Sequence, residues 1–124
     1  MRTFVIVSLL FVPHLASRAQ TKNKAPHVTI VGEVVDSRCY LMQGEDGRGE
    51  KHQECAVECA KEGVPLAILE DKTNLVYFAS KARGMAGANE MLMPFIGEKV
   101  SATGKLSERG GARMIFVDSI EKTR

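Results

Sequence analysis

The chain has 124 residues, with 17 Lys and Arg against 15 Asp and Glu, no Trp and only seven Phe and Tyr. This length fits one domain whose single modest core is built mainly from aliphatic side chains. The near balance of charge argues against the basic surface that a nucleic acid or an anionic membrane would require. We therefore expect no nucleic-acid partner.

Residues 1–19 are predicted to form a signal peptide. Arg2 precedes an apolar run over residues 4–12, and the segment ends in Ser17-Arg18-Ala19, with small residues where a signal peptidase reads. The run is shorter than the roughly 20 residues of a membrane span, and an uncut anchor is the alternative. Cleavage after Ala19 removes two Arg and no acid, which leaves a formally neutral chain. We expect an exported, periplasmic or extracellular protein that meets the membrane only during export.

The remaining chain reads as a flexible lead-in over residues 20–27 and one domain over residues 28–124. Runs rich in Val, Ile and Leu, separated by Gly, Asn and Asp, predict five strands. One of these runs alternates apolar with polar residues and indicates a half-buried strand. A short helix is expected over residues 86–93, ended by Pro94. The predicted strands cover residues 27–36, 66–69, 75–80, 99–106 and 112–120.

This order predicts a mainly β fold with an inserted α segment. Five strands with a short helix between the third and fourth is the order of the OB-fold, a small Greek-key barrel. The tail VSATGKL, a glycine turn and MIFV resemble the end of small exported bacterial OB-fold proteins. The resemblance implies a five-stranded OB-like barrel. It implies no particular activity, since such barrels have many functions.

Residues 37–64 depart from that pattern as an insertion after the first strand, and they contain all three cysteines. The segment SRCY…KHQECAVECAKEG resembles one in other exported bacterial proteins. Helix-forming residues over 50–62 place His52, Cys55 and Cys59 on one stripe, because they are three and four positions apart. Cys39 is expected in a loop ahead of this helix, from which a glycine-rich stretch lets it fold back. Asp36 and Arg38 are expected to cap or solvate that loop.

Cys39, His52, Cys55 and Cys59 form a candidate metal site. Three thiolates and an imidazole are a tetrahedral ligand set for zinc, and soft sulfur also suits cuprous copper. Side chains on a helix lean toward its N-terminus, so His52 leans away from Cys59, and a water or His27 is an alternative fourth ligand. We predict a small exported protein that binds zinc or copper.

The competing hypothesis is a disulfide. Cys39 bonded to Cys55 or Cys59 would staple the insertion and leave one spare thiol. The protein would then be an interaction module that binds a protein or small ligand on the barrel face. A thiol redox protein is a third reading. Nothing in the sequence marks a residue that would orient His52 as a catalytic base, so we expect a binding protein rather than an enzyme.

Overall fold

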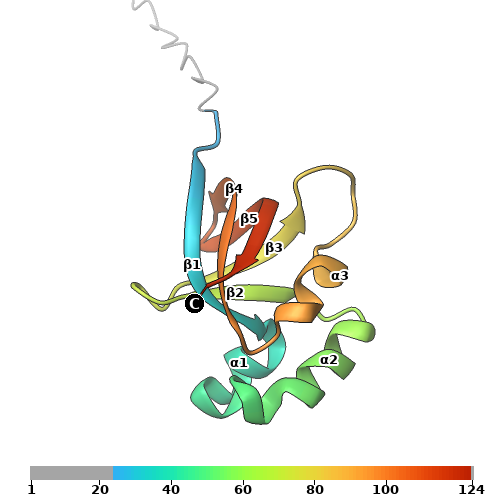
Figure 1. Cartoon of the computed structure of the whole chain (residues 1–124). Coiled ribbons are helices and arrows are strands. Elements are labelled where there is room, and N and C mark those ends of the chain that lie inside the picture. Colours follow the sequence, from blue (N-terminus) through green and yellow to red (C-terminus); the bar gives the residue numbers. More distant parts are fainter. Residues whose placement is uncertain (1–23, 124) are drawn as a thin grey trace, which may run out of the picture.

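The structure, a computed structural model, describes residues 24–123. The predicted signal peptide and the first part of the lead-in lie outside the described residues. Five strands close into a barrel in the order β1-β2-β3-β5-β4 (Figure 1). Of the strand pairs, β3 with β5 is parallel and the other four are antiparallel. The strands are β1 (His27–Asp36), β2 (Leu66–Glu70), β3 (Val76–Lys81), β4 (Lys99–Arg109) and β5 (Ala112–Lys122).

The predicted OB-like barrel is therefore confirmed. In β4 the alternation places Val100, Ala102 and Gly104 in the interior, while Lys99 and Lys105 face solvent. These inward side chains meet those of β1, β2 and β5 in one aliphatic core, and Tyr77 is the aromatic residue buried with them. The core is apolar and continuous, which is the feature that holds a small barrel together.

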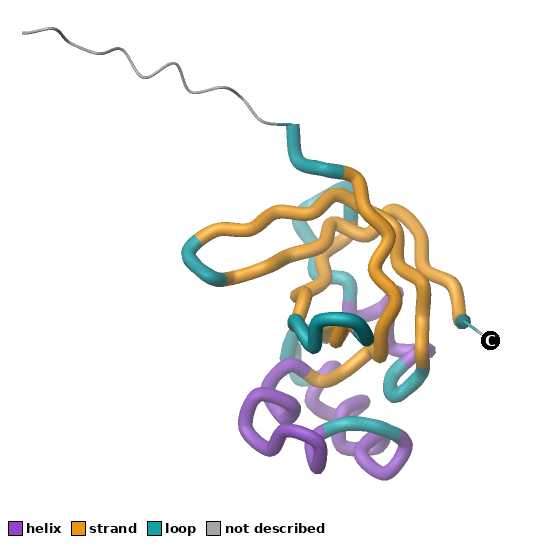
Figure 2. Tube along the Cα trace, turned by 90° about the vertical axis from the view of Figure 1, so that its left-hand side faces the viewer, coloured by secondary structure: helices purple, strands orange, loops and turns teal. Residues whose placement is uncertain are grey.

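The helices gather at one end of the barrel, as Figures 1 and 2 show from two directions. Two lie in the insertion: α1 (Ser37–Gln43) directly continues β1, and α2 (Gln53–Lys61) follows two short 3-10 turns. The third, α3 (Asn89–Leu92), lies between β3 and β4 as predicted but is shorter than predicted: it starts three residues later, and Met93 belongs to the 3-10 turn that follows. The 3-10 turns are η1 (Gly44–Gly47), η2 (Glu50–His52) and η3 (Met93–Phe95).

The expectation that Cys39 lies in a loop is wrong, because the residue belongs to helix α1. The predicted helix over residues 50–62 is also modified at its start, where η2 replaces the first turn and His52 immediately precedes α2. No helix within residues 24–123 combines the length and the apolar character needed to cross a membrane.

Candidate metal centre

The site begins where β1 ends, at Asp36. One carboxylate oxygen, Oδ1, accepts hydrogen bonds from the backbone N–H groups of Arg38 at 2.8 Å and Cys39 at 3.1 Å. Asp36 is thus the N-cap of α1, and it satisfies donors that the first turn of a helix leaves free. The cap starts the helix at Ser37 and turns Cys39 inward, where only 2% of it is exposed.

A tight glycine loop then leads the chain from α1 to His52. A Cβ on Gly47 would collide with the backbone carbonyl of Cys39, so the loop packs against α1 more closely than any side chain would permit. Gly49 adopts a φ of 76°, which favours glycine. Its N–H donates to Glu33 Oε1 at 2.7 Å, and its carbonyl accepts from the N–H of His52 at 3.0 Å. The glycines that read as a flexible stretch therefore fix the position of His52.

Glu33 anchors this loop to the barrel from β1. Its second oxygen pairs with Arg48 at 2.9 Å, and the glutamate side chain is only 9% exposed. Arg48 also reaches Glu45 at 3.5 Å on the solvent side. The ion pair with Arg48 and the hydrogen bond from Gly49 thus tie the loop to β1 at two consecutive residues.

Helix α2 presents the remaining two sulfurs. Ala56 and Ala60 face the barrel core, and their small side chains let the helix lie close to it. The exposed side carries Glu54, Glu58 and Lys61, as the helical spacing predicts. Between the exposed face and the core face lie Cys55, which is exposed, and Cys59, which is partly buried. Both sulfurs thereby lie beside α1.

The donor atoms form two groups that share Cys39. In the first group, Cys39 Sγ, Cys55 Sγ and a ring nitrogen of His52 all lie within 4.8 Å of one another. In the second, Cys39 Sγ, Cys59 Sγ and a carboxylate oxygen of Asp36 lie within the same distance of one another. Cys39 therefore lies close to each of the other three predicted ligands, but Cys59 falls in a different group from His52 and Cys55, so the four do not form one set. Asp36 joins them as a fifth donor that the sequence did not identify in that role.

Two donor atoms in this cluster are buried without a hydrogen-bond partner among residues 24–123. They are Oδ2 of Asp36 and Nε2 of His52, and each residue belongs to one of the two donor groups. Buried polar atoms are nearly always hydrogen bonded, because leaving one unpaired costs about 1–3 kcal/mol. Asp36 lies near Cys39 and Cys59, and His52 lies near Cys39 and Cys55. A metal ion bound in either group would give the unpaired polar atom a partner.

The surroundings of Cys39 and Cys59 favour the protonated thiol at both residues. Burial, with the nearby carboxylate of Asp36 adding to it, raises the pKa of Cys39 to about 12. The neighbouring carboxylate of Asp36, followed by burial, raises the pKa of Cys59. Burial alone would raise the pKa of Asp36, but the Cys59 thiol and the backbone N–H of Cys39 outweigh it and lower that pKa. A cation entering the cluster must therefore displace thiol protons.

The structure supports neither of two alternatives drawn from the sequence, the disulfide and His27 as a fourth ligand. All three cysteines are free thiols, so the disulfide from Cys39 to Cys55 or Cys59 is not found. His27 pairs with Asp118 at 2.9 Å, at the start of β1 and thus at the opposite end of that strand from Asp36. It is therefore not available as the fourth ligand.

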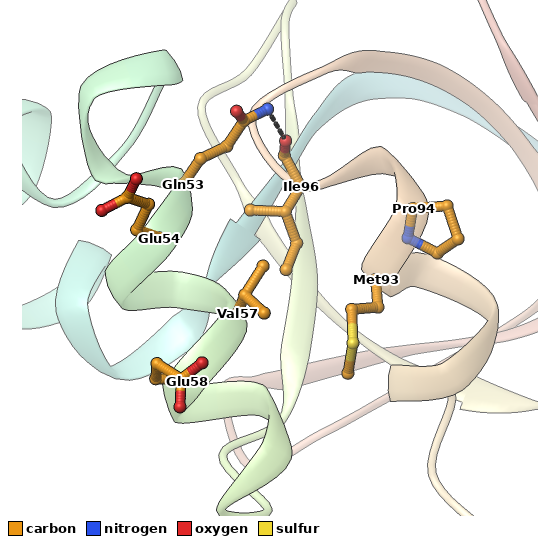
Figure 3. A pocket seen from close by; sticks show the side chains of 7 residues that line it. All are labelled: Gln53, Glu54, Val57, Glu58, Met93, Pro94 and Ile96. Carbon is orange, nitrogen blue, oxygen red and sulfur yellow. Dashed lines mark hydrogen bonds between the residues drawn. The ribbon is translucent and has the colours of Figure 1, made fainter.

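A cavity of about 470 Å³ lies on another side of α2, between this helix and η3. Figure 3 shows the apolar side chains of Val57, Ile96 and Met93 around it, with the carboxylates of Glu54 and Glu58 on the α2 side. The amide of Gln53 donates to the carbonyl of Ile96 at 2.6 Å at one end. None of the four predicted ligands lines this cavity, which makes it separate from the cysteine cluster.

No protein-family model, curated protein or solved structure matches this chain. The function proposed below therefore rests on the site itself.

Proposed function

We propose that this chain is an exported protein that binds a soft metal ion, zinc or cuprous copper, through Cys39, His52, Cys55 and Cys59. The observation that carries the proposal is the convergence of the other donors on the sulfur of Cys39. Three elements contribute them: α1, the η2 turn and α2. Thiolate and imidazole donors are the ligands that zinc and copper prefer.

The cost of the metal-free arrangement supports the proposal. His52 Nε2 and Asp36 Oδ2 are desolvated with no hydrogen bond, and the Cys39 thiol is buried beside a carboxylate. Buried polar groups in such an arrangement are stabilised when they coordinate an ion. A structural role for the cysteines as simple core residues would not explain why two unpaired polar donors flank them.

The graded exposure of the sulfurs favours metal handling over a closed structural site. Cys39 is buried, Cys59 is partly buried and Cys55 is exposed, so the cluster has one side open to solvent. An ion held there remains within reach of an incoming ligand. We propose metal acquisition or transfer outside the cytoplasm as the role, in keeping with the leader predicted over residues 1–19.

Metal content tests the proposal. The full chain, produced with its leader and purified under reducing conditions without chelators, is expected to carry stoichiometric zinc or copper by elemental analysis. Cys55→Ser should lower the amount retained, because it removes an exposed ligand without disturbing the core. Glu54→Gln, one position earlier on the same helix, serves as the control and should retain the wild-type amount.

The opposing outcome is equally clear. Reduced wild-type protein that holds no stoichiometric metal, even after exposure to zinc or cuprous ions, would refute metal binding. Export has its own readout, since the protein recovered from outside the cytoplasm should lack the first 19 residues by mass.

A further inference from the structure

We infer that the cluster holds two divalent ions of the zinc type, which share the sulfur of Cys39, and that Asp36 is a ligand of the second ion. This inference rests on the proposed metal-binding function and deepens it. The first ion would lie among Cys39, His52 and Cys55, and the second among Asp36, Cys39 and Cys59.

The grouping of the donors supports two positions. Each group has three ligand atoms within 4.8 Å of one another, and Cys39 is the member common to both. Cys55 and Cys59 are four residues apart on α2, which separates their Cα atoms by about 6 Å along the helix axis. Each of these cysteines therefore has its own partner from outside α2: His52 for the first and Asp36 for the second.

Asp36 is buried, held in one orientation and has an unpaired oxygen, which are the properties expected of a metal ligand. It is 1% exposed, and its Oδ1 is fixed by the two backbone N–H groups of the α1 cap. The other oxygen, Oδ2, is buried and unpaired. A cap alone needs one oxygen, so the cap does not account for the second. Carboxylate oxygen binds zinc but suits cuprous copper poorly, which favours a divalent, borderline ion.

The charges of the cluster favour the same count. Three thiolates and one carboxylate carry four negative charges, with His52 neutral as a ligand. When all three cysteines are bound as thiolates, two divalent ions neutralise this set in a site whose Cys39 and Asp36 are buried. Uncompensated buried charge is strongly unfavourable. Arg48 offers no compensation, because its guanidinium is engaged by Glu33 and Glu45.

The test counts zinc ions by native mass spectrometry on the full reduced chain, loaded with zinc alone and freed of excess ion. Wild type should hold two zinc ions. Asp36→Asn should hold one, because asparagine caps a helix about as well as aspartate but lacks the anionic oxygen. Asp118→Asn, the same change at an exposed carboxylate beside His27, is the control and should hold two.

Two cysteine variants extend the pattern should Asp36→Asn fail to fold. Cys59→Ser removes a ligand of the second ion and should leave one zinc, while Cys39→Ser removes the shared sulfur and should leave none. A wild type that saturates at one zinc, or an Asp36→Asn or Cys59→Ser variant that keeps two, overturns the second position. A single zinc leaves the proposed function intact, whereas a wild type that binds no zinc and no copper refutes both.

Discussion

Cys39 owes its position to residues on both sides of it. Asp36 starts helix α1 by capping the N–H of Cys39 itself, and Gly47 brings the following loop against the carbonyl of the same residue. The shared sulfur is therefore held by backbone contacts at two points. A change at either point should alter metal binding even though no ligand is removed.

Gly47→Ala tests this dependence. The new methyl group would overlap the Cys39 carbonyl, so either the loop or α1 must shift. We expect a loss of about 1–3 kcal/mol in the free energy of unfolding, as for other overpacked sites. Zinc affinity should fall at least tenfold by isothermal titration calorimetry, since His52 follows the displaced loop.

Gly87→Ala is the matched control for that substitution. Nothing lies within 4 Å of a Cβ at Gly87, and the residue is far in sequence from the cluster. Its stability and zinc affinity should stay close to those of wild type. If Gly47→Ala binds zinc as tightly as Gly87→Ala does, then the loop does not position the site.

At the scale of elements, Asn89 joins three parts of the fold. Its Oδ1 accepts from the N–H of Leu66 at the start of β2, at 2.9 Å. Its Nδ2 donates to the carbonyls of Ala60 at 3.0 Å, in α2, and Val64 at 2.8 Å. The side chain therefore ties the C-terminal end of the cysteine helix to the barrel, and it does so from the first residue of α3.

Asn89→Asp should disrupt this junction. The carboxylate keeps the acceptor for Leu66 but loses both donors, and it faces two carbonyl oxygens. We expect the free energy of unfolding in urea to fall by about 2 kcal/mol or more, because two carbonyls lose their partners. Asn74→Asp makes the same chemical change in an exposed turn and should cost no more than about 0.5 kcal/mol. Equal effects at the two positions would show that Asn89 has no special structural role.

The strands could be predicted from the sequence because local signals determine them. β1 has the predicted bounds, and β4 shows the predicted alternation, since period-two burial and glycine turns are properties of short segments. Helix α1 could not be predicted in the same way. It has seven residues, Leu41 and Met42 on it are exposed, and its start depends on the Asp36 side chain rather than on an apolar period.

The candidate site likewise has one part that local sequence spacing predicts and one part that it does not. The spacing of His52, Cys55 and Cys59 predicted one set with Cys39, and the structure places each of the three near Cys39 in two separate groups. The role of Asp36 as a donor depends on an oxygen that remains unpaired after folding, and residue order does not contain that information. Aspartate is a common N-cap residue, but the cap at Asp36 uses only one of its oxygens.

At the scale of the whole molecule, the barrel and the helical insertion differ in what stabilises them. The five strands close on one another through backbone hydrogen bonds and enclose the aliphatic core. The insertion contains two helices of seven and nine residues, which are too short to be stable alone. Its fully buried contacts with the main core come from Ala56 and Ala60, whose small side chains bury little area, while Val57 and Tyr40 pack against the cores only in part.

Zinc should therefore stabilise the insertion more than the barrel. Because the ions would cross-link α1, η2 and α2, we expect amide hydrogen exchange over residues 37–62 to slow at least tenfold when zinc is added to metal-free protein. Exchange in β4 and β5 should change little, since their hydrogen bonds do not depend on the cluster. Mass spectrometry of proteolytic fragments resolves the two regions. Calcium, which prefers oxygen ligands, is the control cation and should have no effect. Equal protection in both regions would instead mean that the metal ion stabilises the barrel and its insertion as one cooperative unit.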